Sequence, residues 1–121
     1  MTKILTVDDA AFMRKIIKTT LKRAGYTEIY EAADGIQAIQ IYGQIKPDLV
    51  LMDITMPNLN GLNALKAIKT VDPNANVVMC TAMGQEVLVI DAIRSGAKDF
   101  IVKPFKPERI INVVANIIGK P

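Results

Sequence analysis

The sequence of 121 residues contains no histidine and only one cysteine, Cys80. Without histidine, Ser-His and Cys-His catalytic sites are excluded, and a zinc site would lack its usual ligands. A single cysteine also excludes a disulfide within the chain. Because Cys80 lies in an apolar run, we predict that it is a buried structural thiol rather than a nucleophile.

Long apolar segments and strong net charge are also missing. No apolar run approaches the length that crosses a bilayer, and the start of the chain resembles a strand more than a cleavable leader. The net charge is only +3, and the one basic cluster (Lys15, Lys18, Lys22 and Arg23) has no aromatic residues between its members. We therefore predict a cytoplasmic protein that binds neither membranes nor nucleic acid.

What the sequence does contain is a series of short apolar runs, each followed by polar residues. Runs rich in Val, Ile and Leu are typical of strands that are buried on both faces of a parallel sheet. The four runs are Ile4–Val7, Leu49–Met52, Val77–Cys80 and Phe100–Val102. A weaker fifth strand is predicted over Glu28–Ala33.

Between these runs the apolar residues recur with helical spacing, and the last helix begins at Pro107. Strands that alternate with helices predict an α/β fold, a (βα)5 doubly wound, flavodoxin-like domain with a five-stranded parallel sheet and helices on both faces. The predicted helix at Gln85–Ser95 is apolar nearly all round. Either it packs into the core, or part of its surface serves a partner.

The polar residues that follow the runs indicate where the function lies. Asp8 and Asp9 follow the run Ile4–Val7, and Asp53 follows the run Leu49–Met52. Thr81 follows Val77–Cys80, and Lys103 follows Phe100–Val102. Because the carboxyl ends of parallel strands share one edge of the sheet, we expect these side chains to converge on one site.

Three converging carboxylates predict a site for a divalent cation. Carboxylates so close repel one another, and Mg²⁺ relieves the repulsion while keeping waters and accepting phosphate oxygens as further ligands. The alternative is that Asp8 or Asp9 merely caps the following helix. Capping explains one of these residues but not the approach of Asp53.

The other converging groups extend this prediction to phosphoryl transfer. Lys103 supplies a compact positive charge beside Asp53, and Thr81 supplies a hydroxyl donor. The small residue Ala82 leaves room for a phosphoryl donor, and we expect its backbone N–H to be able to hold a phosphoryl oxygen. A cation, a hydroxyl and Mg²⁺ around one carboxylate suit the transfer of a phosphoryl group to Asp53.

With these residues identified, the whole chain resembles the receiver domains of response regulators. The motifs that carry the resemblance are Val7-Asp8-Asp9, Met52-Asp53-Ile54-Thr55-Met56-Pro57, Asn60-Gly61, Thr81-Ala82, Ser95-Gly96-Ala97 and Lys103-Pro104-Phe105. The resemblance implies that residues 1–121 form a single receiver domain with no output domain.

The resemblance also implies roles for the acidic residues. Asp53 would be the phosphoacceptor for a phosphohistidine on a partner kinase. Asp9 and Asp53 would bind Mg²⁺ directly, together with the main-chain carbonyl of Thr55, and Asp8 would assist through water.

The resemblance also implies which residues would contact the phosphoryl group and how phosphorylation would change the surface. Thr81 and Lys103 would contact the phosphoryl group, and the Lys103–Pro104 peptide bond would be cis. As Thr81 moves toward the phosphoryl group, Phe100 would turn inward, a steric switch that changes the surface around the Gln85–Ser95 helix. The alternative is that Phe100 is a static core residue.

Two stretches, Asp9–Arg14 and Thr81–Gln85, are most similar to single-domain chemotaxis regulators. This similarity implies a monomer that receives its phosphoryl group from a chemotaxis histidine kinase, binds the flagellar motor switch, and is a substrate for a phosphatase. The first alternative is a phosphorelay intermediate.

Other classes of protein fit the sequence less well. A Mg²⁺-dependent phosphatase with an aspartyl-phosphate intermediate would need an acid two residues after Asp53, where this chain has Thr55. We therefore expect no enzymatic turnover of outside substrates. A nucleotide-binding module would need a Gly-rich phosphate loop, and a transcription factor would need a further domain.

Overall fold

The computed structural model describes residues 2–56 and 58–121, in which strands and helices alternate. The strands are β1 (Lys3–Val7), β2 (Glu28–Ala32), β3 (Leu49–Asp53), β4 (Val77–Thr81) and β5 (Asp99–Val102). The helices are α1 (Ala11–Arg23), α2 (Gly35–Ile45), α3 (Gly61–Val71), α4 (Glu86–Arg94) and α5 (Pro107–Ile118).

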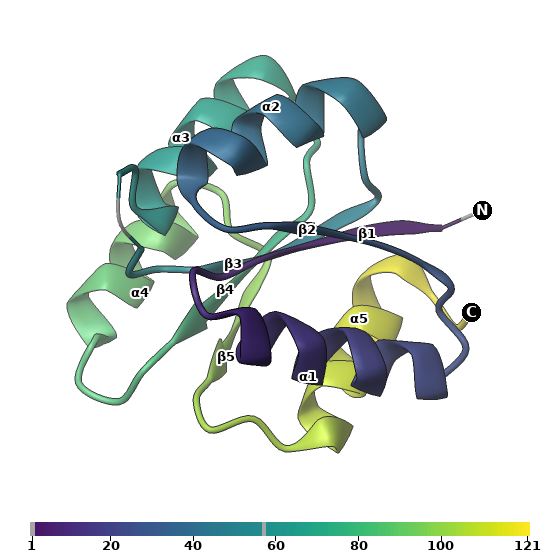
Figure 1. Ribbon diagram of the computed structural model, residues 1–121. Coiled ribbons are helices and arrows are strands. Elements are labelled where there is room, and N and C mark those ends of the chain that lie inside the picture. Colours follow the sequence, from purple (N-terminus) through teal and green to yellow (C-terminus); the bar gives the residue numbers. More distant parts are fainter. Residues whose placement is uncertain (1, 57) are drawn as a thin grey trace.

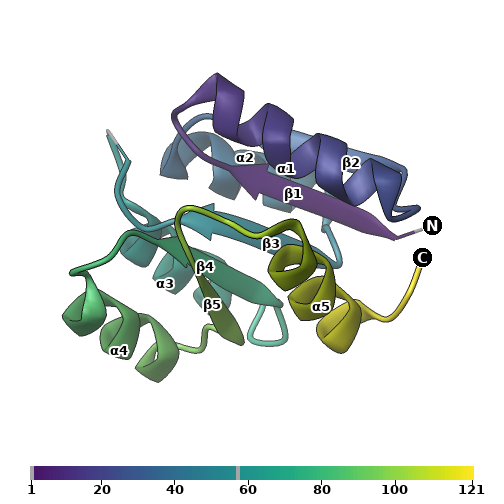
Figure 2. The ribbon, with the colours of Figure 1, turned by 90° about the horizontal axis from the view of Figure 1, so that it is seen from below.

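The strands form one parallel sheet in the order β2-β1-β3-β4-β5. Helices α1 and α5 lie together on one face, and α2, α3 and α4 cover the other (Figures 1 and 2). The predicted doubly wound, flavodoxin-like (βα)5 fold is therefore confirmed. The strand order reverses between β1 and β3, so the loops that follow these two strands diverge and leave a crevice between them.

The central strands are buried on both faces, as their apolar composition predicts. Every residue of β3 and of β4 is buried. Because side chains alternate along a strand, Leu49 and Leu51 pack into the core under α1 and α5, whereas Val50 and Met52 pack under α2 and α3. Cys80 on β4 is also buried, and burial raises the pKa of its thiol to about 12. The prediction of a structural thiol is confirmed.

Side chains at the helix starts explain two of the helix boundaries. The Asp34 carboxylate accepts a hydrogen bond from the Gln37 backbone N–H at the start of α2, and Asn60 accepts one from Asn63 at the start of α3. These are capping bonds that satisfy backbone donors left free in the first turn. Within residues 2–56 and 58–121, no helix is both long and apolar enough to cross a membrane.

Helix α4 is apolar nearly all round but lies largely at the surface. Ala92 is its buried residue, whereas Val87, Ile90 and Ile93 are 72%, 51% and 44% exposed. For these three side chains the expectation of core packing is wrong. The fold leaves a face of α4 open because an outer helix of a three-layer domain contacts the sheet on only one side.

Candidate functional site

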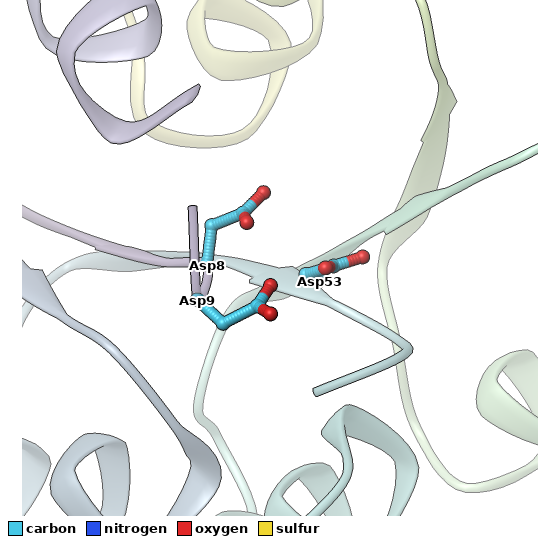
Figure 3. Close-up of side chains that lie close together, drawn as sticks. All are labelled: Asp8, Asp9 and Asp53. Atoms are coloured by element: carbon cyan, nitrogen blue, oxygen red, sulfur yellow. The ribbon is translucent and has the colours of Figure 1, made fainter. Parts of the chain in front are cut away.

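The acidic site forms where β1 and β3 end. Asp53 is the last residue of β3, and Asp8 and Asp9 follow β1 directly. Figure 3 shows the three side chains next to one another beyond the strand ends. One carboxylate oxygen from each lies within 4.8 Å of the other two. The structure therefore brings together the three carboxylates that the sequence places at one sheet edge.

The turn after β1 fixes Asp8 by its backbone as well as its side chain. The Asp8 N–H donates to Ala32 O at 3.1 Å, and the Asp8 carbonyl accepts from Arg14 Nη1 at 2.6 Å. The Asp8 carboxylate accepts from the backbone N–H of Ala10, which is itself the residue before α1. Neither Asp8 nor Asp9 occupies the capping position of α1, so the alternative that one of them caps this helix is wrong.

Lys103 brings a positive charge into the cluster from the end of β5. Its Nζ lies 2.9 Å from Asp8 Oδ2 and 3.3 Å from Asp53 Oδ1. Partial burial acts to lower the pKa of Lys103, but the hydrogen bond to Asp8 and the charges of both carboxylates outweigh it, so the pKa is raised. The side chain is therefore an ammonium ion at neutral pH and is held at the site.

Asp53 is the member of the acidic cluster that lies within a strand, at the end of the central strand β3. It is only 7% exposed, and burial raises the pKa of its carboxyl, an effect that Lys103 offsets only in part. A nearby cation would stabilise the ionised form. Three carboxylates and one ammonium leave the cluster with a net double negative charge, and all the carboxylate donors are hard oxygens. This donor set fits Mg²⁺.

Close packing of α3 against the end of β3 holds the Asp53 backbone in place. The Gly61 N–H donates to Ile54 O at 2.8 Å, and a Cβ atom at Gly61 would collide with the carbonyl oxygen of Asp53. Only glycine permits this approach. Gly61 is thus a positioning residue for Asp53, a role that sequence reasoning did not assign to it.

On the other side of Asp53, the end of β4 supplies Thr81 and Ala82. The Thr81 hydroxyl and the Ala82 backbone N–H both donate to Gln85 Oε1, at 2.8 and 2.7 Å. Gln85 Nε2 in turn donates to the Thr55 hydroxyl at 2.7 Å. Sequence reasoning missed Gln85, and the available signal was a long polar residue at the start of a helix four positions after Thr81.

The remaining predicted residues lie beside this group. The Lys103–Pro104 peptide bond is cis. Phe100 is half-buried and lines, with Thr81, an open apolar groove of about 650 Å³ between α4 and β5. Pro57, which belongs to the motif after Asp53, lies outside the described residues.

Comparison with known proteins identifies the family. The model of the response regulator receiver domain matches residues 4–115. The chain therefore belongs to the response regulator receiver domain family, and the resemblance seen in its motifs is confirmed.

Individual proteins that are similar to this chain indicate which kind of receiver domain it resembles. The chemotaxis protein CheY of Thermotoga maritima is 50% identical over 115 residues, which are 95% of this chain and 96% of that protein. The chemotaxis protein CheY of Bacillus subtilis is 54% identical over 112 residues, or 93% of each. Among solved structures, the CheX-CheY-BeF3-Mg²⁺ complex from Borrelia burgdorferi has a TM-score of 0.91 at 37% identity, covering 96% of this chain and 88% of that one. These findings support a role in two-component signalling and chemotaxis through phosphorylation.

Proposed function

We propose that this protein is a phosphorylation-activated switch in which Asp53 accepts a phosphoryl group from a histidine kinase. The observation that carries the proposal is the environment of the Asp53 carboxylate. It is buried, lies 3.3 Å from Lys103 Nζ, and shares a cluster with Asp8 and Asp9. A carboxylate held among positive and metal-binding groups is suited to attack on phosphorus.

In the proposed reaction, a carboxylate oxygen of Asp53 attacks the phosphorus of a phosphohistidine. An O–P bond forms, the P–N bond breaks, and its electron pair returns to the imidazole nitrogen. The Lys103 ammonium, the Thr81 hydroxyl and the Ala82 N–H would contact the phosphoryl oxygens and stabilise their charge. Later attack by water on the acyl phosphate would release phosphate and restore Asp53.

We propose Mg²⁺ as the cofactor. Asp9 and Asp53 would hold it with the main-chain carbonyl of Thr55, and Asp8 would act through water. When bound, the cation neutralises charge on the carboxylates and on the transferred group. The fit of the donor set supports this assignment, since the cluster carries a net double negative charge.

The proposed switch links this site to the groove between α4 and β5. Movement of Thr81 toward the phosphoryl group would vacate space into which Phe100 turns. The position of both residues on one groove supports this step. Phe100 has no hydroxyl, so its movement would act through shape alone. If the Phe100 ring keeps the same NMR environment with and without beryllofluoride, the static interpretation is correct.

We propose a chemotaxis histidine kinase as donor, the flagellar motor switch as target, and a phosphatase as a further partner. The exposed apolar residues Val87, Ile90 and Ile93 beside the groove support binding of a protein target. A monomeric, cytoplasmic, single-domain protein remains the prediction. A phosphorelay intermediate is the alternative, and it would bind a histidine phosphotransfer domain more tightly than a motor-switch peptide.

We do not propose enzymatic turnover of outside substrates. Thr55, the second residue after Asp53, carries a hydroxyl rather than the carboxyl that would serve as general acid. In the structure this hydroxyl accepts a hydrogen bond from Gln85. The chain would then catalyse only its own phosphorylation and dephosphorylation.

Intact mass after incubation with Mg²⁺ and a small phosphodonor tests the acceptor chemistry. We expect one phosphoryl group on the wild type and none on Asp53→Asn or without Mg²⁺. Because fast hydrolysis would hide the adduct, the same samples are tested for Mg²⁺-dependent binding of beryllofluoride. Failure of both measurements with the wild type would disprove the proposed function.

A further inference from the structure

Gln85 contacts the site, but the proposed function gives it no part in binding the metal or in accepting the phosphoryl group. Its carboxamide contacts three of the site residues, with Oε1 accepting from Thr81 and Ala82 and Nε2 donating to Thr55. We propose that Gln85 is a latch: in the unphosphorylated protein it occupies the donors of Thr81 and Ala82, and phosphorylation of Asp53 must displace it. This inference rests on the proposed function, in which those two donors bind the phosphoryl group.

The direction of the hydrogen bonds fixes how the latch is built. A backbone N–H can only donate, so the atom of Gln85 that faces Ala82 must be the carbonyl oxygen Oε1. The Thr81 hydroxyl lies 2.8 Å from the same oxygen. The amide nitrogen is then directed at the Thr55 hydroxyl. One carboxamide oxygen therefore accepts from both of the donors that would otherwise point to a phosphoryl oxygen.

The latch also fixes the start of α4. Gln85 is the residue that precedes this helix, and its side chain makes no capping bond to the first turn. In α2 and α3 the equivalent residues, Asp34 and Asn60, use their side chains to cap the helix. Gln85 instead ties the beginning of α4 to the ends of β3 and β4. Ala92 is the one fully buried residue of α4, and Leu88 and Val89 pack partly buried against the core, so these bonds add to a limited apolar attachment.

Displacement of the latch therefore couples two events. When phosphoryl oxygens accept from Thr81 and Ala82, Gln85 Oε1 loses both donors, and the start of α4 loses two of the three hydrogen bonds that connect it to the site. The hydrogen bonds of Thr81 and Ala82 to Gln85 must be broken for phosphorylation and therefore oppose it. A variant that lacks these two hydrogen bonds should be phosphorylated more readily. Because exchanged neutral hydrogen bonds each contribute modestly, we expect removal to tighten binding of an acyl-phosphate mimic by roughly 3- to 10-fold.

The latch is tested first in the unmodified protein, without metal or phosphodonor. NMR hydrogen exchange of the Ala82 amide is compared in wild type, Gln85→Met and Gln85→Glu. Methionine keeps the length but removes the acceptor, so exchange should accelerate about tenfold or more. Glutamate keeps two acceptor oxygens and should preserve the protection. Gln40→Met, which makes the same change at an exposed position of α2, serves as the control and should leave Ala82 unaffected. Equal Ala82 exchange in wild type and Gln85→Met would disprove the latch.

The second measurement is the dissociation constant for beryllofluoride in the presence of Mg²⁺. Gln85→Met should bind roughly 3- to 10-fold more tightly than wild type, Gln85→Glu more weakly, and Gln40→Met equally. A general effect of charge would change only the Glu variant. If wild type binds beryllofluoride as tightly as Gln85→Met does, or more tightly, the latch is overturned and the proposed function stays intact. No binding by wild type overturns the proposed function and, with it, the role assigned to Gln85.

Discussion

Helices α3 and α4 lie next to each other on the same face of the sheet but are held in different ways (Figure 1). Helix α3 is capped by Asn60 and buries Ala64, Leu65 and Ile68. Helix α4 has no side-chain cap and buries Ala92 alone. Both are rich in apolar residues, so composition does not distinguish them. The contrast shows that α3 contributes more to the core. Helix α4 packs Ala92 and the partly buried Leu88 and Val89 against it and presents its other apolar side chains to solvent.

The largest expected difference is in core packing. Leu65 on α3 is fully buried, and Leu65→Ala should lower the free energy of unfolding by about 2–5 kcal/mol because a cavity replaces the side chain. Urea unfolding measures the change. A loss below about 1 kcal/mol would show that α3 is no better packed than α4.

The second difference between α3 and α4 is a side-chain hydrogen bond at the end of α3. The Tyr42 hydroxyl on α2 donates to Asp72 Oδ2 at 2.7 Å, just beyond α3. Burial raises the pKa of Tyr42, and the hydrogen bond to Asp72 raises it further. The stabilising contribution is therefore complete below the unfolded-state pKa of about 10 and is lost as the pH rises above it, by up to about 1.4 kcal/mol per pH unit.

Unfolding experiments between about pH 8 and pH 11 test this, with Tyr42→Phe as the comparison. Wild type should lose stability more steeply above about pH 10 than the variant does. Parallel curves for the two proteins would mean that the Tyr42 hydroxyl does not link α2 to the end of α3.

The third difference lies in the caps. Asn60→Ala should cost about 1 kcal/mol because the N–H of Asn63 loses its acceptor. Asn60→Asp keeps an acceptor oxygen and should retain most of the stability. Thermal unfolding of the three proteins separates loss of the cap from any other effect of the substitution, since only alanine removes the acceptor.

The smallest effect is expected on α4. Ile90 is 51% exposed, so Ile90→Ser should change the free energy of unfolding by no more than about 0.5 kcal/mol. Urea unfolding under the conditions used for Leu65→Ala gives a direct comparison. A loss above about 1.5 kcal/mol would contradict the loose attachment of α4 and indicate that its outer face is packed.

Much of this arrangement was predictable because it follows from strand periodicity and chain direction. Apolar runs located β3 and β4 to within a residue, and the parallel topology then brought Asp8 and Asp53 to one edge. The distribution of contacts was not predictable at the same level. Lys103 lies closer to Asp8 than to Asp53, and Gln85 turns back toward Thr81, because these positions depend on loop geometry that periodicity does not encode.

The same limit applies to helix faces. Periodicity shows that α4 is apolar, but the side of an outer helix that meets the sheet depends on the length and direction of the loops at its ends. For Gly61, the sequence indicated only a turn before α3. Its close approach to the Asp53 carbonyl became visible once the packing of α3 on β3 was known.

The site collects its groups from four neighbouring strands, and this has a consequence for how the protein is made. Asp8 and Lys103 are 95 positions apart in the chain yet share a hydrogen bond. During synthesis the carboxylates emerge long before the lysine, which joins them only after β5 has paired with β4. Under the proposed function, an unfinished or partly folded chain lacks the ammonium that balances Asp53. Competence to receive the signal therefore reports that these four strands have been assembled into the sheet.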